Sequence, residues 1–508
     1  MDYLAPAFLA EARRWYDAVL PPIAARQREN AGPVIAVQLD NEVGMLDWVS
    51  NTPTLTDGAL RDFAEWSGGR FGGAVRAGAA GTPQELALHH ELARFTRDRF
   101  ARYLQTLESW ARGGGITAPL LVNIHGTGGG RGLTYPIGVS QLAPAYRGRE
   151  GVTGGTDMYL GELTVANAVD LYLGNAFTAA VHGEGQPLAE LEFDAGGGYG
   201  EDFASLTSPE VTVLKTLLDV AQGTRILNYY LFACGINPPL DEPAGDGDDR
   251  IAFTGERHGF AAPIGPEGER TPSLAAVASA TAAVRENAEL FATGAQLTDD
   301  LVLGFVADHY LTEYSHPAAQ NRAEQVRARE RHRGFGARET LGRALVLGGW
   351  SFRALDLQAA AGSDTAWSAG TPADAREGRS REAIVLVSGR ELGRGVQEFL
   401  TCHVTTGGRL VLVGELPGVD ADGVPCTVLA DALGVTDAGQ VRDWSDADRE
   451  YRPSVRAAGP LAEHGRPVRR RGVRGPAPRP RPRRPRRRGA DRRVRAPSAA
   501  REVPARAL

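Results

Sequence analysis

The chain has almost no lysine, few cysteines and no long apolar run. Of its 56 basic residues only one, Lys215, is a lysine. The three cysteines, Cys234, Cys402 and Cys426, are too few and too widely spaced for a disulfide framework or a zinc site. No apolar run approaches the roughly 18 residues that span a membrane, and no basic segment followed by an apolar one opens the chain. We therefore expect a cytoplasmic protein that does not enter a membrane.

Charge is unevenly distributed along the 508 residues. The formal net charge is −6, yet residues 452–508 hold 19 arginines and only three acids. The rest of the chain is therefore strongly acidic, which argues against binding of nucleic acid or of an anionic membrane.

Residues 449–508 are predicted to form a disordered basic tail. From residue 452 onward there is no aromatic residue and no isoleucine, and ten of the 31 prolines lie there. Such a segment buries too little apolar surface to offset the entropy lost on ordering. Its Arg/Pro/Ala/Gly composition is also what a GC-rich gene gives when it is read out of frame, and the true domain would then end near Asp448.

The first part of the chain alternates short apolar runs with helical patterns. Runs typical of strands buried on both faces of a parallel sheet lie at 33–39, 119–125, 157–160, 187–192 and 225–232. The predicted strand ends near 125, 159, 192 and 230 are separated by 33 to 38 residues, the length of a βα unit. The pattern favours either a (β/α)8 barrel or an open doubly wound sheet. No glycine-rich phosphate turn follows the first run, which disfavours an open nucleotide- or flavin-binding sheet.

Helices are predicted between these runs. Apolar residues at spacings of three and four mark 7–27 and 90–112. A third helix is expected to begin after Ser208, with proline at its first position. Its predicted buried face consists of Leu214, Leu217, Leu218 and Ala221.

A second, smaller α/β domain of flavodoxin-like type is predicted over 338–448. Helical patterns at 338–347 and 391–403 alternate with strand patterns at 352–357, 384–388 and 409–413. Residues 1–292 would then form the first domain and residues 293–337 a connector. The second domain has no phosphate loop, so we expect no flavin or other cofactor.

Two glutamates are predicted at the carboxyl ends of strands. Glu42 follows the first apolar run and Glu192 ends the fourth. Active sites of barrels lie on that face. A carboxylate pair there suits glycosidic cleavage, and a separation of about 5–5.5 Å would indicate the retaining mechanism. Glu190, two residues earlier in the same strand, is a rival nucleophile. The alternative without a function is that these acids at strand ends are merely solvated or bind a helix N-terminus.

Other polar residues at strand ends are weaker candidates. His125 and Asn123 end the second run, where a site role and a structural hydrogen bond both stay open. Asp157 and Tyr159, at the third run, are predicted to line a sugar pocket.

Four segments carry a family resemblance. They are GPVIAVQLDNEVG at 32–44, PLAELEFDAG at 187–196, LNYYLFACGIN at 227–237 and FAAPIGPEG at 260–268. They resemble, in the same order, four motifs of glycoside hydrolase family 35, the β-galactosidases: GGPII-x-VQ-x-ENEYG, P-L-x-x-x-E-x-x-x-G, N-x-YMFHGGTN and YDAP-x-DE-x-G. The likeness covers roughly residues 1–290.

The resemblance implies a role for each matching residue. Glu42 would be the general acid/base, Glu192 the nucleophile, and Asn41 would hold the sugar 2-hydroxyl in the transition state. Tyr230 would donate a hydrogen bond to the nucleophile. The matched strands would be the fourth to eighth of the family's barrel, so we expect an incomplete TIM (β/α)8 barrel followed by the flavodoxin-like domain.

We therefore expect a retaining exo-β-glycosidase, most closely a β-galactosidase, that acts on terminal β-galactosides or related oligosaccharides. The double displacement needs neither metal nor cofactor. Because three barrel strands would be missing, the chain as given is expected to be weakly active or inactive. The alternative is a non-catalytic carbohydrate-binding or scaffold remnant of a glycosidase.

Overall fold

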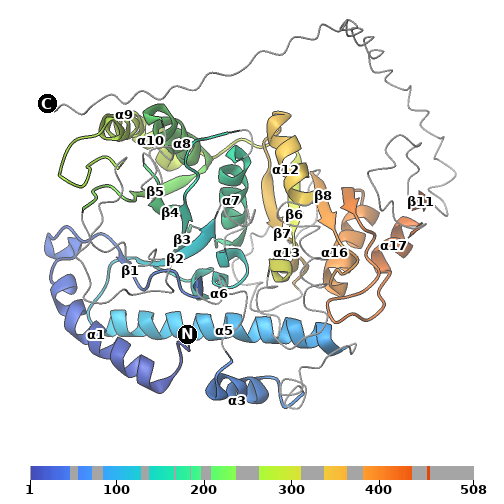
Figure 1. Ribbon diagram of the computed structural model, residues 1–508. Helices are drawn as coiled ribbons and strands as arrows, with labels where there is room; N and C mark the ends of the chain where they lie inside the picture. The colour runs from blue at the N-terminus through green and yellow to red at the C-terminus, as the bar shows by residue number, and fades with distance from the viewer. Residues whose placement is uncertain are drawn as a thin grey trace, which may run out of the picture.

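Two parallel sheets organise the chain, and Figure 1 shows them side by side with the helix α7 between them. The structure is a computed structural model. It describes residues 2–45, 55–70, 84–127, 137–164, 167–183, 185–195, 208–235, 262–310, 337–362, 382–437 and 455–457.

The first sheet has five parallel strands in the order in which they occur in the chain. They are β1 (Val37–Gln38), β2 (Leu120–Thr127), β3 (Val152–Met158), β4 (Leu188–Phe193) and β5 (Thr224–Tyr229). A doubly wound sheet reverses its strand order at a switch point, whereas a barrel does not. The curled sheet is therefore half of a barrel, as the sequence predicted.

Strand β3 begins at Val152, five residues before the predicted run. The sequence pattern missed the start of this strand because Gly154 and Gly155 interrupt the apolar run. A Cβ atom on Gly154 would lie 2.8 Å from Ile124 Cδ1 and 2.9 Å from the Tyr146 ring, so a larger residue would displace both neighbours.

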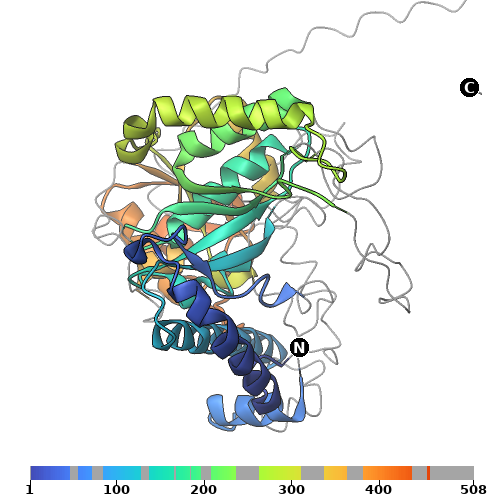
Figure 2. The same ribbon diagram turned by 90° about the vertical axis from the view of Figure 1, so that its left-hand side faces the viewer.

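Helices cover the outside of the half-barrel (Figure 2). After the strands come α5 (Gln84–Gly113), α6 (Ala143–Tyr146), α7 (Ala168–Val181), α8 (Pro209–Gln222) and α9 (Pro272–Glu286), which α10 (Ala288–Thr293) follows. The N-terminal α1 (Pro6–Ala24) and α3 (Asp57–Trp66) pack against α5. In the part of the chain that is described, no helix is both long and apolar enough to cross a bilayer.

Helix α8 begins after Ser208 as predicted, but its predicted buried face is wrong. Leu214 and Leu218 are 49% and 42% exposed. The buried side instead carries polar groups, namely Thr212, Lys215, Thr216 and Asp219. Three of these have polar partners on neighbouring elements: Lys215 meets Asp194, Thr216 meets the Tyr229 hydroxyl, and Asp219 accepts from Asn175. Apolar periodicity cannot reveal such partners.

The second sheet has four parallel strands in the order β7-β6-β8-β9. They are β6 (Leu301–Phe305), β7 (Arg353–Asp356), β8 (Ala383–Ser388) and β9 (Arg409–Gly414). This order is that of the first four strands of a flavodoxin-like sheet. The fold class predicted for this part is confirmed. The connector predicted at 293–337 is wrong in one respect, since it contains β6, which pairs with β7 on one side and with β8 on the other.

Helices α12 (Ala337–Leu347), α13 (Leu357–Ala361), α16 (Arg394–Thr405) and α17 (Val428–Leu433) accompany the second sheet. A short antiparallel pair joins β10 (Val435–Asp437) to β11 (Val455–Ala457). Apart from β11, the predicted basic tail lies outside the described residues.

Helix α7 belongs to the cores of both sheets. Its Phe177 meets Phe305 of β6 edge to face, with ring centroids 4.6 Å apart. The Tyr172 hydroxyl donates to the Phe352 carbonyl oxygen at 2.7 Å. One apolar cluster therefore runs from the half-barrel into the second sheet.

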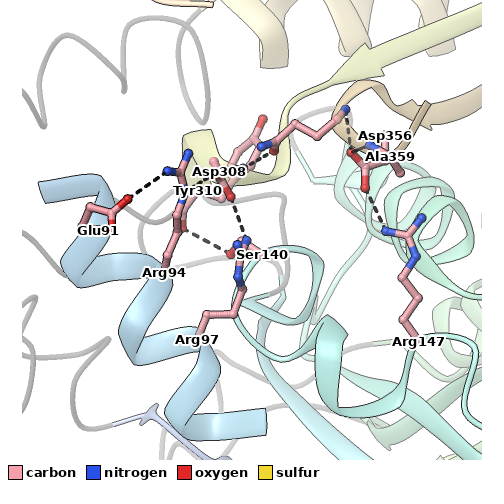
Figure 3. A network of polar contacts seen from close by, with 10 residues as sticks. Glu91, Arg94, Arg97, Ser140, Arg147, Asp308, Tyr310, Asp356 and Ala359 are labelled. Atoms are coloured by element: carbon pink, nitrogen blue, oxygen red, sulfur yellow. Dashed lines mark hydrogen bonds and ion pairs between the residues drawn. The ribbon is translucent and has the colours of Figure 1, made fainter. Parts of the chain in front are cut away.

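Buried ion pairs join the two sheets beside this core (Figure 3). Asp308, in the 3-10 turn Ala307–Tyr310 after β6, accepts from Arg94 Nε at 2.9 Å and from Arg97 Nη1 at 2.7 Å. Arg147 Nη1 lies 3.1 Å from Asp356 Oδ2, with both side chains 2% exposed. These contacts fix α5 and α6 against the second sheet.

Candidate active site

Three carboxyl groups meet at the carboxyl end of the half-barrel. Glu42 follows β1, Asp157 lies in β3 and Glu192 lies in β4, and their carboxylate oxygens approach within 4.8 Å of one another. Retaining glycosidases hold their two carboxyl groups about 5–5.5 Å apart, and inverting ones about 6.5–9.5 Å apart. The closest oxygens of Glu42 and Glu192 lie within 4.8 Å of each other, which is compatible with the retaining separation.

Glu42 is held in an unusual backbone conformation. Its φ of 48° lies in the left-handed region, which non-glycine residues seldom adopt. Its backbone N–H donates to Asn123 Oδ1 at 2.9 Å, which anchors the turn to β2. Burial, and then the nearby Glu192 carboxylate, raise the pKa of Glu42. A raised pKa keeps a carboxyl protonated nearer to neutral pH, as a general acid requires.

Asp157 is the most deeply buried of the three acids, at 2% exposure. The Asn123 Nδ2 group donates to its Oδ1 at 2.7 Å. Burial, and then the charges of Glu192 and Glu42, raise the pKa of Asp157 to about 9, against the opposing effect of the Asn123 hydrogen bond. Asp157 is therefore a neutral acid at pH 7, so three adjacent negative charges are avoided.

Glu192 accepts a hydrogen bond from Tyr159. The Tyr159 hydroxyl donates to Glu192 Oε2. Tyr230 packs edge-on against Tyr159, with ring centroids 6.4 Å apart. Family likeness implied such a hydrogen bond for Tyr230, which the structure places beside the Tyr159 ring.

Glu190 does not share the face of Glu192, contrary to the expectation that made it a rival nucleophile. Thr156 pairs with Glu190 and Asp157 with Glu192, so β4 has one extra residue at this point. This bulge turns the two glutamates to different sides. Glu190 accepts from the Thr156 hydroxyl at 2.6 Å.

The surroundings of Glu190 agree with this placement. Burial and the charge of Asp219 in α8 raise the pKa of Glu190 well above its usual value. Asp219 in turn accepts from Asn175 of α7 at 2.6 Å. Glu190 therefore lies under the helices rather than in the site.

Asn41 and His125 each contact a residue other than Glu42, Asp157 and Glu192. Asn41 is exposed, and its Oδ1 accepts from Gln38 Nε2 at 2.9 Å. His125 is buried, with Nε2 3.2 Å from the Val43 carbonyl oxygen. Burial lowers the pKa of His125 to about 4, although the contact with Val43 opposes the shift, so the imidazole is neutral. His125 thus holds the segment that follows Glu42.

Asn123 is the residue whose role the sequence left open. Its side chain binds the Glu42 backbone with one end and the Asp157 carboxyl with the other. The only signal in the sequence is an asparagine within the strand run 119–125, which is equally typical of a buried structural amide.

Among the described residues, Glu42, Asp157 and Glu192 form the only cluster of potential metal ligands that lie close enough together to surround a cation. Oxygen ligands of this kind suit Mg²⁺, Ca²⁺ or Mn²⁺. A proton on Asp157 relieves the same repulsion without an ion, and the glycosidic chemistry considered below uses no metal.

Comparison with known proteins finds similarity in both parts of the chain. A family model described as "GLMA-like, second domain" matches residues 318–457. A β-1,2-glucosyltransferase of Ignavibacterium album is 24% identical over 256 residues, which are 47% of this chain and 35% of that protein. The chain thus spans about a third of this curated relative.

Solved β-galactosidases share the fold. The cold-adapted enzyme from Rahnella sp. R3 gives a TM-score of 0.55 at 14% identity, over 86% of this chain and 59% of that one. The enzyme from Bacillus circulans gives 0.55 at 12% identity, over 85% and 59%. At such identities the likeness is one of fold, a glycosidase-type barrel followed by a second α/β domain. The chain covers less than two thirds of each enzyme.

Proposed function

We propose that the protein is a retaining exo-β-glycosidase of the β-galactosidase type, related to glycoside hydrolase family 35. Glu192 acts as the nucleophile and Glu42 as the general acid/base. Its substrate is a terminal β-galactoside or a related oligosaccharide.

One observation carries this proposal: Glu42 and Glu192 present carboxylate oxygens within 4.8 Å of each other at the carboxyl end of a half-barrel. In the first step Glu192 bonds to the anomeric carbon while the glycosidic C–O bond breaks and the leaving oxygen takes the proton of Glu42. In the second step Glu42, now a carboxylate, takes a proton from water while the water oxygen bonds to the anomeric carbon and the bond from that carbon to Glu192 breaks, which releases the sugar and restores both groups.

The two acids have different surroundings. Burial and the nearby Glu192 carboxylate raise the pKa of Glu42, which favours its protonated form. Glu192 accepts a hydrogen bond from the Tyr159 hydroxyl. A protonated Glu42 beside Glu192 suits the pairing of a general acid with a nucleophile. The four motifs of the sequence support the galactoside preference.

Glycosyl transfer is a second candidate, because the Ignavibacterium album relative is a glucosyltransferase. The same covalent intermediate would be intercepted by a sugar hydroxyl instead of water. Product analysis at increasing concentrations of an acceptor sugar separates the two functions.

The test is hydrolysis of a panel of nitrophenyl β-glycosides, with NMR detection of the first anomer released. We expect slow cleavage of the β-galactoside, with retention, and no cleavage by the Glu192→Gln variant. Release of the inverted anomer would refute the mechanism. Galactoside binding without any turnover would instead favour the carbohydrate-binding alternative.

A further inference from the structure

Asp194 holds the backbone on both sides of Tyr159. Its own N–H donates to the Met158 carbonyl oxygen at 3.2 Å. Its carboxylate accepts from the Gly161 N–H at 3.1 Å and lies 3.4 Å from the Leu160 nitrogen. The residues before and after Tyr159 are therefore tied to one residue, Met158 through the Asp194 backbone and Leu160 and Gly161 through its carboxylate.

Lys215 of α8 fixes that side chain. Its Nζ lies 2.7 Å from Asp194 Oδ2, and its side chain is 0% exposed. The ammonium also lies 5.7 Å from the centroid of the Phe193 ring. A buried ammonium is tolerated only when it is paired, so Lys215 restricts where the Asp194 carboxylate can lie. The single lysine of the chain is thus placed behind the end of β4.

We propose that Asp194 and Lys215 are positioning residues for the nucleophile, because they hold Tyr159 where its hydroxyl meets Glu192 Oε2. The inference rests on the proposed function, in which Glu192 attacks the anomeric carbon. The Tyr159 hydrogen bond occupies Oε2, which leaves the other oxygen of Glu192 to form the new bond. The clamp on the Tyr159 backbone therefore sets the direction of attack.

The clamp is tested by replacing both charges together, since the loss of either alone would leave a buried unpaired charge. The variant is Lys215→Met with Asp194→Asn. Its matched control is Arg147→Met with Asp356→Asn, the buried pair at the interface of the sheets. We expect the first pair to lower kcat on the nitrophenyl galactoside by about 10- to 100-fold with little change in KM, as for a small misplacement of reacting groups. The control should leave both constants unchanged.

A double-mutant cycle with Tyr159→Phe distinguishes positioning from a general structural defect. If Asp194 and Lys215 act through Tyr159, then adding Tyr159→Phe to that variant lowers kcat by much less than Tyr159→Phe does in the wild type. Added to the control pair, Tyr159→Phe should have its full effect. Losses that multiply independently in both backgrounds would overturn the inference.

Hydrogen exchange of residues 158–164 provides a readout that does not depend on activity. The Leu160 and Gly161 amides should exchange at least about tenfold faster in the Asp194→Asn/Lys215→Met variant and at the wild-type rate in the control. Unchanged exchange would overturn the clamp. If the wild type hydrolyses no glycoside, the proposed function fails, and faster exchange in this variant alone would still establish the clamp.

Discussion

Asn123 ties Asp157 to the site by a 2.7 Å hydrogen bond from its Nδ2 to Asp157 Oδ1. The same side chain accepts the Glu42 backbone N–H through Oδ1. One amide thus sets the position of two of the three acids. Because the Asn123 amide donates to Oδ1, the proton of Asp157 belongs on Oδ2.

We predict that Asp157 is neutral during catalysis and that its ionisation ends activity. The pKa of about 9 places this loss on the alkaline side, where a third negative charge would form beside Glu42 and Glu192. The Asp157→Asn variant cannot ionise, so its activity should persist to higher pH than that of the wild type. The check is kcat/KM from pH 6 to pH 10 on a dinitrophenyl galactoside, whose leaving group does not need the proton of Glu42. A wild-type alkaline limb that is unchanged in Asp157→Asn would contradict the assignment.

The same shift predicts an effect on stability. A buried carboxyl whose folded pKa is raised disfavours the folded state above its unfolded pKa, near 3.9, because it must take up a proton on folding. Asp157→Asn should therefore raise the free energy of unfolding at pH 7. The gain should shrink as the pH falls toward 4. Urea denaturation at both pH values measures it, and a gain that is independent of pH would argue for a packing effect instead.

We predict that Glu42 serves as the acid only where the leaving group needs a proton. Glu42→Gln should lower kcat/KM by about 10²–10⁴-fold on an alkyl galactoside, the usual contribution of general acid catalysis. The loss should be much smaller on a dinitrophenyl galactoside, whose leaving group departs without a proton. Equal losses on both substrates would remove Glu42 from this role.

Asp308 is predicted to be a major stabiliser of the interface between the sheets. Although burial opposes the shift, Arg97 and Arg94 lower the pKa of Asp308 below its usual range. Its contribution is therefore complete above the unfolded pKa near 3.9 and is lost as the pH falls below it. At pH 7, Asp308→Asn should cost about 3–5 kcal/mol, because the buried guanidinium of Arg97 and the half-buried one of Arg94 lose the charge of Asp308.

A matched control for Asp308 is the exposed pair of Arg13 and Asp17 on α1, with nitrogen and oxygen 2.8 Å apart. Asp17→Asn should cost no more than about 0.5 kcal/mol, as for other exposed pairs one helical turn apart. Both are measured by urea denaturation at pH 7. Similar losses in the two variants would show that the interface pair has no special role.

Much of the fold could be predicted from the sequence because apolar runs and helical periodicity report burial directly. The apolar runs before Glu42 and Glu192 therefore marked the two strands that lead into the site. The side of the sheet to which Glu190 points could not be predicted, because the bulge in β4 depends on how β4 pairs with β3. The buried face of α8 was missed because Lys215, Thr216 and Asp219 are stabilised by polar partners on other elements, which apolar periodicity does not report. Strand β6 was missed because its five residues look like an isolated apolar stretch.

The proposed nucleophile can also be examined by chemical rescue. Glu192→Gly should lower kcat by about 10⁴-fold or more, as when other covalent nucleophiles are removed. Azide should restore part of the rate and give a β-to-α inverted glycosyl azide, because a small anion can occupy the vacated volume. Glu190→Gly is the control. Azide rescue in that variant would mean that the two glutamates have been assigned to the wrong sides of β4.

The central claim is that Glu192 forms a covalent bond to the sugar, and trapping of the intermediate tests it most directly. The protein is incubated with a dinitrophenyl 2-deoxy-2-fluoro-β-galactoside, and its peptides are mapped by mass spectrometry. We predict an increase equal to one fluorosugar on the peptide that contains Glu192, with fragmentation placing it on Glu192 and not on Glu190. Label on Glu190 or Glu42, or turnover of galactosides without any labelled peptide, would contradict the account.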